Sequence, residues 1–294
     1  MQTSRRSILK GSILASLAGT MGATAMSASA AEKQAALPKK EYDLVICGLG
    51  IGGIVTAIRA AQDGLKPVIL EKMSSASGNT IYSAGFMLGV NTKMQQEKKL
   101  ETGDTVDKFY EDMMKVSQGR GDPKLTRLVA EKADETLNWL HDYVGVKYAV
   151  GMKLVWPMLQ RAHLTIGEKK PGGTQLMLYL LAKAKELNVP IVYNAKAVEL
   201  LDNPQNGKVI GVKVKSKEGF EEYFGKYGVV MATGGFSANK MMLTMMAGVP
   251  AANMPVRGSH SVTGESILLT GPYFPKVVNV DQYHCGPIHG PTGA

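Results

Sequence analysis

The chain has 294 residues, of which 45% are hydrophobic and 20% charged, with 33 glycines and two cysteines. This composition excludes a disordered, collagen-like or disulfide-stapled chain. The formal net charge is +9, but the lysines and arginines are scattered and no basic stripe alternates with aromatic residues, so nucleic-acid binding is not expected.

The amino terminus has the pattern of an export signal. Residues 4–10 read Ser-Arg-Arg-Ser-Ile-Leu-Lys, a mildly apolar stretch follows, and Ala28-Ser-Ala30 comes next. This order predicts a twin-arginine signal peptide over residues 1–30, cleaved after Ala30, with the Tat translocase as partner during export. An ordinary Sec signal or an uncleaved amphipathic start are the alternatives. Because the twin-arginine route carries folded proteins, we expect a periplasmic protein whose cofactor is inserted inside the cell.

A dinucleotide-binding turn follows a predicted linker over residues 31–41. The apolar run from Tyr42 is typical of a β-strand, and it leads directly into Gly48-Leu-Gly50-Ile-Gly-Gly53. In this pattern Gly48 allows a tight turn, Gly50 lets the backbone approach a pyrophosphate, and Gly53 lets the following helix pack against the strand. The unpaired N–H groups of that helix would then face the phosphates.

A second strand completes the signature of a dinucleotide site. Residues 67–71 read Pro-Val-Ile-Leu-Glu, so Glu71 ends the strand 23 positions after Gly48, where its carboxylate can accept hydrogen bonds from ribose hydroxyls. The same carboxylate would repel a 2′-phosphate, which favours FAD or NAD over NADP. A loop of small residues over 77–85 then stands where a simple NAD domain would begin another βαβ unit.

Three helices are expected next, over residues 104–115, 122–139 and 174–187. Asp122 and Pro123 suit the start of the second helix. All three helices are expected to cover the sheet and the cofactor site, and the second carries an apolar stripe of Leu125, Leu128, Val129 and Leu137.

The remaining strands complete the predicted fold. They are expected over residues 191–193, 197–201, 209–217 and 226–231, and the middle two form a small antiparallel β-meander. The last one leads into a second glycine turn, Ala232-Thr-Gly-Gly235, which brings backbone close to a ligand. The predicted class is α/β, a Rossmann-like domain with a central parallel sheet and a β-meander.

The chain resembles the flavoprotein subunits of the soluble fumarate reductase family, the flavocytochrome c group of the succinate dehydrogenase/fumarate reductase superfamily. The resemblance runs from Tyr42 to about Tyr283. It is carried by the first glycine turn, Glu71-Lys72, the 77–85 loop, Arg161-Ala-His163 and residues 232–236. It implies an FAD enzyme that reduces or dehydrogenates a carbon–carbon bond beside a carboxylate or carbonyl.

The resemblance also implies which residues line FAD. Together with the glycine turns, it gives a predicted cofactor site of Gly48, Gly50, Gly53, Glu71, Lys72, Asn79, Thr80, Gly85, Ala197, Thr233, Gly234 and Glu265. Asn79 stands where membrane-bound relatives carry a histidine bonded to the flavin, which implies non-covalent FAD. Glu265 stands where the family has an aspartate near the flavin.

Candidate catalytic residues lie near the end of the sequence. His284 and His289 are each a candidate for a substrate-facing histidine or an ordinary loop residue, and His163 has either a structural role or a place near substrate. The family's proton-donating arginine would lie beyond Ala294. We therefore expect an incomplete FAD-binding domain over 42–280, the start of a capping domain over 281–294, and the rest of that capping domain absent.

No metal site is predicted, and no Cys-x-x-Cys-His motif for haem attachment occurs. The predicted electron donor is therefore a separate cytochrome c or a quinol-linked partner. The expected function is reduction of the C=C bond of an unsaturated carboxylate such as fumarate, methacrylate or urocanate. The alternatives are a truncated FAD-binding module without catalysis, and a dehydrogenase of ketosteroid or tricarballylate type.

Overall fold

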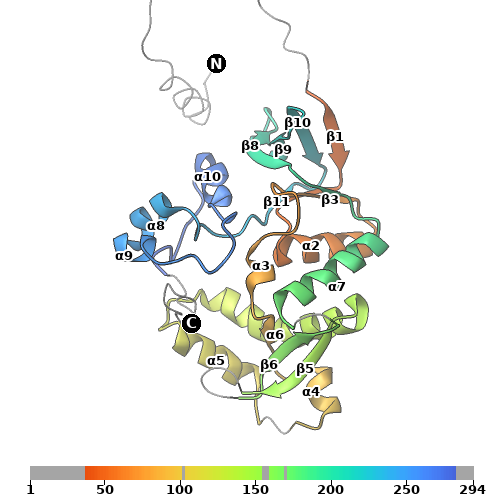
Figure 1. Cartoon of the computed structure of the whole chain (residues 1–294), viewed down its shortest axis with the longest axis vertical. Helices are drawn as coiled ribbons and strands as arrows, with labels where there is room; N and C mark the ends of the chain where they lie inside the picture. Colours follow the sequence, from red (N-terminus) through yellow and green to blue (C-terminus); the bar gives the residue numbers. More distant parts are fainter. Residues whose placement is uncertain (1–36, 101–102, 154–158, 169–170, 283–294) are drawn as a thin grey trace, which may run out of the picture.

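The computed structural model describes residues 37–100, 103–153, 159–168 and 171–282 (Figure 1). The predicted signal peptide and both candidate catalytic histidines, His284 and His289, lie outside these ranges.

A parallel sheet forms the centre of the domain, as the sequence predicts. Its strand order is β11-β2-β3-β7, and every neighbouring pair is parallel. The strands are β2 (Leu44–Cys47), β3 (Pro67–Leu70), β7 (Ile191–Val192) and β11 (Val229–Met231). Parallel strands bring their carboxyl ends to one edge, and the two glycine turns follow β2 and β11 at that edge.

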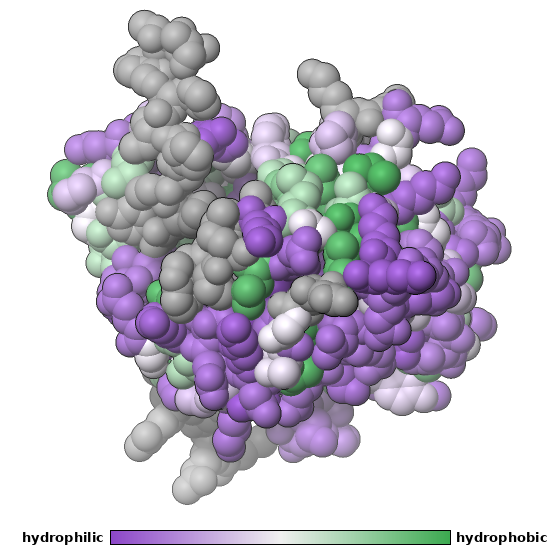
Figure 2. Space-filling model, turned by 90° about the horizontal axis from the view of Figure 1, so that it is seen from below, coloured by the Kyte–Doolittle hydropathy of each residue, from purple (hydrophilic) through white to green (hydrophobic). Residues whose placement is uncertain are grey.

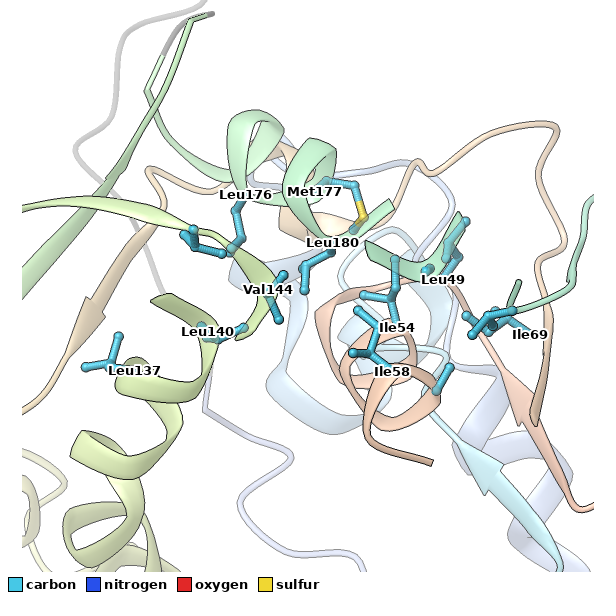
Figure 3. Packing of buried hydrophobic residues seen from close by; sticks show 14 of the residues in the cluster. Leu49, Ile54, Ile58, Ile69, Leu137, Leu140, Val144, Leu176, Met177 and Leu180 are labelled. Carbon is cyan, nitrogen blue, oxygen red and sulfur yellow. The ribbon is translucent and has the colours of Figure 1, made fainter. Parts of the chain in front are cut away.

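The two faces of strand β2 pack into different clusters because successive side chains point to opposite sides. On one side Ile46 joins Ile54 and Ile58 of helix α2 (Ile51–Gln62) and Leu180 of helix α7 (Gly173–Glu186), all 0% exposed (Figure 3). On the other side lie Val45 and Cys47, packed with residues of the β-meander. The central strand therefore holds helices on one face and a second sheet on the other.

That second sheet contains the two predicted strands of the β-meander, β8 and β9, and two further strands, β10 and β1. It runs β1-β10-β9-β8, with β8–β9 and β9–β10 antiparallel. Its strands are β1 (Lys39–Tyr42), β8 (Lys196–Asp202), β9 (Val209–Lys215) and β10 (Phe220–Gly225). Strand β1 pairs parallel with β10, so Lys39–Tyr42 belong to the sheet, although all but Tyr42 were assigned to the linker. A polar edge strand carries little apolar signal, which explains the difference.

The structure also contains a third sheet that the sequence analysis did not predict. Its antiparallel strand order is β4-β6-β5, and it forms part of a lower lobe with the helices around it (Figure 1). The strands are β4 (Phe86–Leu88), β5 (Lys147–Met152) and β6 (Ala162–Ile166); the surrounding elements are α3 (Asn79–Tyr82), α4 (Lys93–Glu97), α5 (Val106–Val116), α6 (Pro123–Trp139) and the π-helical turn η1 (Leu140–Val144).

The three predicted helices form as α5, α6 and α7, but the expected role of α6 is wrong. Leu137 is buried, whereas Leu125, Leu128 and Val129 are 63%, 52% and 54% exposed. The reason is that the first half of α6 packs on α5 through Ala130, in a small cluster with Phe109, away from the central sheet. Periodicity located the helix but could not say which part of its apolar stripe has a partner.

The last described elements are α8 (Lys240–Ala247), α9 (Val249–Ala252), α10 (Glu265–Thr270) and the 3-10 turn η2 (Gly271–Tyr273). None of the helices within the described residues is long and apolar enough to cross a membrane. Seen from below, the described surface is mostly hydrophilic with small groups of apolar side chains (Figure 2).

Candidate functional site

A cavity of about 330 Å³ opens at the carboxyl ends of β2, β3 and β11. This is the edge at which open parallel α/β sheets bind their ligands. Its lining comes from six segments of the chain and comprises Cys47, Gly48, Leu49, Gly50, Ile51, Gly52, Leu70, Glu71, Lys72, Gly78, Asn79, Thr80, Ala195, Lys196, Ala197, Ala232, Thr233, Gly234, Ser261, Val262 and Glu265.

The first glycine turn forms the floor of the cavity, and its glycines do different work. Gly48 has a φ of +110°, and a Cβ there would collide with the Ala232 carbonyl oxygen, so the two glycine turns touch. At Gly50 the nearest atom to a Cβ would be Thr80 Oγ1 at 3.7 Å, so no protein atom crowds the space beside it. That space is the cradle that a bound pyrophosphate would need, and a side chain would fill it.

Two predicted cofactor residues do not line the cavity. A Cβ on Gly53 would collide with the Gly48 carbonyl oxygen, so Gly53 serves helix–strand packing, as the motif also requires. Gly85 has a φ of +71° and lies against the backbone of Gly172, where the 77–85 loop meets the start of α7. Both glycines therefore shape the site through packing and not through a cavity surface.

The amino terminus of helix α2 faces this cradle. Gly50 is its N-cap and supplies no side chain, but Thr80 Oγ1 accepts a hydrogen bond from the Ile51 N–H at 2.9 Å. The first turn carries no acidic residue, so nothing on the helix neutralises its positive end. An anionic group is the ligand that such a terminus favours.

Glu71 is held in one orientation at the end of β3. It is 7% exposed, its Oε2 accepts from the Leu49 N–H at 2.9 Å, and its Oε1 accepts from the Met73 N–H at 2.9 Å. Burial, and then the negative charge of Glu71, raise the pKa of Tyr193. Each carboxylate oxygen keeps a second lone pair. The group can therefore accept hydrogen bonds from ribose hydroxyls, as the sequence predicts.

An ion pair forms another wall of the cavity. Lys72 Nζ lies 2.6 Å from Glu265 Oε1, and Thr263 Oγ1 accepts from Lys72 at 3.0 Å while donating to the same Glu265 oxygen at 2.7 Å. Burial disfavours the charged form of Glu265, but the hydrogen bonds from Lys72 and Thr263 outweigh burial and hold its pKa below the ordinary value. Glu265 is thus an ionised carboxylate.

The other oxygen of Glu265 is the clearest sign that this cavity takes a ligand. Glu265 Oε2 is buried and has no hydrogen-bond partner among the described residues. A buried carboxylate oxygen without a donor is costly. A ligand hydroxyl or N–H would satisfy it, so the donor set fits the hydroxyl-rich chain of a flavin dinucleotide.

Several lining residues were not among the predicted cofactor residues, and those outside the two glycine turns and the strands before them are Gly78, Ala195, Lys196, Ser261 and Val262. Each lies one to four positions from a predicted site residue: Gly78 precedes Asn79, Ala195 and Lys196 precede Ala197, and Ser261 and Val262 precede Glu265. Closeness in sequence to the motif residues would have been the signal that these residues line the cavity.

His163 has a structural role and does not line the cavity. It is 0% exposed, its Nδ1 lies 2.9 Å from the Arg161 carbonyl oxygen, and its Nε2 lies 2.7 Å from Thr92 Oγ1. Nδ1–H therefore donates to the carbonyl and Nε2 accepts from the hydroxyl. Burial lowers the pKa of this imidazole, so the ring is neutral.

Arg161 is also structural. Its guanidinium pairs with Asp104 at 2.5 and 2.7 Å and with Asp112 at 2.7 Å, and its side chain is 6% exposed. These contacts join the residue directly before β6 to α5 and to the segment before α5. The Arg-Ala-His signature of the sequence thus marks the interior of the lower lobe. Among the described residues, no group of three or more His, Cys, Asp or Glu side chains could hold a metal ion.

Comparison with known proteins agrees with this geometry. The family model described as "FAD binding domain" matches residues 43–270. The chain belongs to this family. The resemblance to fumarate reductase flavoproteins is confirmed, since relatives include a probable fumarate reductase Ifc3 of Shewanella frigidimarina, 27% identical over 256 residues and covering 87% of this chain. A urocanate reductase of Eggerthella lenta is 32% identical over 210 residues, covering 69% of this chain.

Solved structures show the same fold. A 3-ketosteroid-delta4-(5alpha)-dehydrogenase from Rhodococcus jostii matches 84% of this chain with a TM-score of 0.73 and 25% identity. The open conformation of a flavocytochrome c3 fumarate reductase matches 92% with a TM-score of 0.73 and 24% identity. The chain spans 42% and 33% of the two curated relatives, and 58% and 43% of the two solved chains.

Proposed function

We propose that this chain holds FAD non-covalently in an oxidoreductase that reduces the C=C bond of an unsaturated carboxylate such as fumarate, methacrylate or urocanate. The observation that carries the proposal is the cavity itself. An open cradle at Gly50, a fixed Glu71 carboxylate and the unpartnered Oε2 of Glu265 lie along one cavity in a chain of the FAD-binding family. The names of the relatives support substrates with a reducible double bond.

Different lining residues would hold different parts of the cofactor. The start of α2 would hold the pyrophosphate, Glu71 would accept hydrogen bonds from the ribose hydroxyls, and Glu265 would accept one from a hydroxyl or N–H of the cofactor. When bound, FAD supplies the two-electron chemistry of hydride exchange with carbon. Lys72 keeps Glu265 charged and oriented, so its free oxygen can only accept a hydrogen bond.

Asn79 supports the proposal of non-covalent binding. A carboxamide is not a nucleophile, and its oxygen already accepts from the Ser259 N–H at 2.8 Å. Burial raises the pKa of the Cys47 thiol, which also lines the cavity, to about 12, so this thiol is not a thiolate nucleophile either. On denaturation of the protein, we expect FAD to be released as the free, unmodified cofactor.

Export to the periplasm belongs to the same proposal. It rests on the twin-arginine pattern with cleavage after Ala30, which lies outside the described residues. The proposed electron donor is a separate cytochrome c or a quinol-linked partner, and the Tat translocase is the partner during export. His284 and His289 remain the candidates for substrate contact, in the predicted start of a capping domain over 281–294.

Two other functions stay open to the same test. A module that binds FAD without turnover is one. A steroid-type or tricarballylate-type dehydrogenase is the other, and the likeness to the 3-ketosteroid dehydrogenase structure favours its steroid form.

The decisive experiment starts with the purified chain and its absorption spectrum. We expect a flavin band, release of free FAD on acid denaturation, and oxidation of a reduced viologen dye when fumarate or urocanate is added. Flavin without turnover would favour the binding module, and reduction of an acceptor dye by a saturated steroid would favour the dehydrogenase. A colourless protein that gains no thermal stability from added FAD would overturn the proposal.

A further inference from the structure

One wall of the cavity is a single irregular segment, residues 258–263, which we call the pocket strap. Ser261 and Val262 of the strap line the cavity, and Ser259 and Val262 are only 3% and 4% exposed. The strap lies between α9 and α10 and contains no helix or strand of its own. Its position therefore depends on the contacts at its two ends.

The carboxyl end of the strap is anchored by several bonds. The Ala238 N–H donates to the Val262 carbonyl oxygen at 2.9 Å, and Asn239 Nδ2 donates to the Thr263 carbonyl oxygen at 3.1 Å. Lys72 adds its bond to the Thr263 hydroxyl at 3.0 Å. This end is thus fixed both to the start of α8 and to the end of β3.

The side chain of Asn79 anchors the amino end of the strap. The Ser259 N–H donates to Asn79 Oδ1 at 2.8 Å, across 180 positions of sequence. A Cβ on Gly258 would collide with that same oxygen, so the strap passes directly over the amide. A second bond from this end to the 77–82 region, from Ser261 Oγ to the Ser77 carbonyl oxygen, is 3.5 Å long and weak.

The Ser259 N–H determines which atom of the Asn79 carboxamide faces the strap. A backbone N–H needs an acceptor, so the carboxamide oxygen points at Ser259 and the Nδ2 group is left as a donor. We infer that Asn79 is a positioning residue, whose Oδ1 ties down the pocket strap and thereby sets how fast FAD leaves the cavity. This inference rests on the proposed FAD site, whereas the tether is a contact between two groups of the protein itself.

Two substitutions of Asn79 separate the tether from a direct contact with FAD. Asn79→Asp keeps an acceptor oxygen and loses the Nδ2 donor, whereas Asn79→Ala loses both. We expect Asn79→Ala to release FAD roughly two- to tenfold faster than the wild type, the effect of one ordinary hydrogen bond, and Asn79→Asp to stay close to the wild-type rate. Equal acceleration in both variants would mean that the acceptor oxygen does not set the release rate and would overturn the inference.

A matched control is available in the lower lobe. Asn138 Oδ1 also accepts from a backbone N–H, that of Lys93 at 3.0 Å, and it does not line the cavity. Asn138→Ala should leave the FAD release rate unchanged. FAD release is followed by the rise in flavin fluorescence when the cofactor leaves the protein, and thermal unfolding of each variant checks that it folds.

A second readout needs no cofactor. Trypsin can cut after Arg257, directly before the strap, and hydrogen exchange reports the 258–263 amides. In the ligand-free protein we expect faster cutting and faster exchange in Asn79→Ala, with Asn79→Asp and Asn138→Ala unchanged. If the chain bound no FAD, the proposed function would fail while this measurement still decided the tether. Unchanged exchange in Asn79→Ala would overturn the tether, and faster exchange with unchanged FAD release would overturn its control of release.

Discussion

Lys72 and Glu265 lie 193 positions apart in the sequence, yet their side chains meet at 2.6 Å in the wall of the cavity. Lys72 follows strand β3 and Glu265 opens helix α10, so the pair joins the first nucleotide-binding unit to the last described helix. Thr263 bonds to both, which leaves one carboxylate oxygen for a ligand. The pair fixes the charge and the direction of that oxygen.

Removing the Glu265 carboxylate should weaken FAD binding. We expect Glu265→Ala to raise the Kd for FAD about ten- to a hundredfold, because a hydrogen bond to a charged group contributes about 1.5–3 kcal/mol. Titration of the ligand-free protein, followed by flavin fluorescence, measures the change. Glu41→Gln, at an exposed position of β1, is the control and should bind as the wild type does. An unchanged Kd for Glu265→Ala would remove Glu265 from the site.

Gly53 and Gly52 should respond differently to the same added methyl group. A Cβ at Gly53 would collide with the Gly48 carbonyl oxygen, whereas nothing lies within 4 Å of a Cβ at Gly52. We expect Gly53→Ala to lower the free energy of unfolding of the ligand-free protein by about 1–3 kcal/mol, the usual cost of overpacking. Gly52→Ala should change it by no more than about 0.5 kcal/mol. Urea unfolding measures both, and equal effects would contradict the packing role of Gly53.

Arg161 should be one of the most sensitive positions for stability. Substitution by methionine leaves Asp104, whose side chain is 0% exposed, without its cation. Breaking a buried ion pair in this way costs about 3–5 kcal/mol. Urea unfolding of Arg161→Met is compared with Arg127→Gln, which breaks the exposed pair with Asp107 and should have little effect. Similar losses of unfolding free energy in Arg161→Met and Arg127→Gln would argue against a special role for the buried ion pair of Arg161 with Asp104.

His163 should make the protein sensitive to mild acid. Its pKa is lower in the folded protein than the ordinary value of 6.5, mainly because of burial. The unfolded chain therefore takes up the proton first. The stability that the neutral ring provides is complete above pH 6.5 and is lost progressively as the pH falls from there toward the folded-state pKa.

The measurement is the urea midpoint at about pH 7.5 and about pH 5.5, on either side of the ordinary histidine pKa. The decrease in the urea midpoint between the higher and the lower pH should be smaller in His163→Gln than in the wild type. His260→Gln, at an exposed position, should keep the full drop. A drop of wild-type size in His163→Gln would contradict a buried neutral imidazole.

The sequence by itself determined the central sheet and the first half of the site. Gly48, Gly50 and Glu71 could be placed because a short strand, a glycine turn and a helix form one local unit whose geometry depends on neighbours in sequence. The β-meander was predicted for the same reason, since alternation and turn residues are local signals. The family resemblance extended the prediction to Lys72, Asn79 and Glu265.

Only the tertiary structure decided how these residues work together. The contacts of Lys72 with Glu265 and of Asn79 with Ser259 span more than 170 positions, and no local pattern encodes which distant backbone a side chain will meet. The same limit explains α6, where periodicity found the helix but only packing showed that Leu125 lies in solvent. It also explains His163, for which the sequence left a structural role and a place near substrate open. Burial and ion pairing assign His163 and its neighbour Arg161 to the interior of the lower lobe.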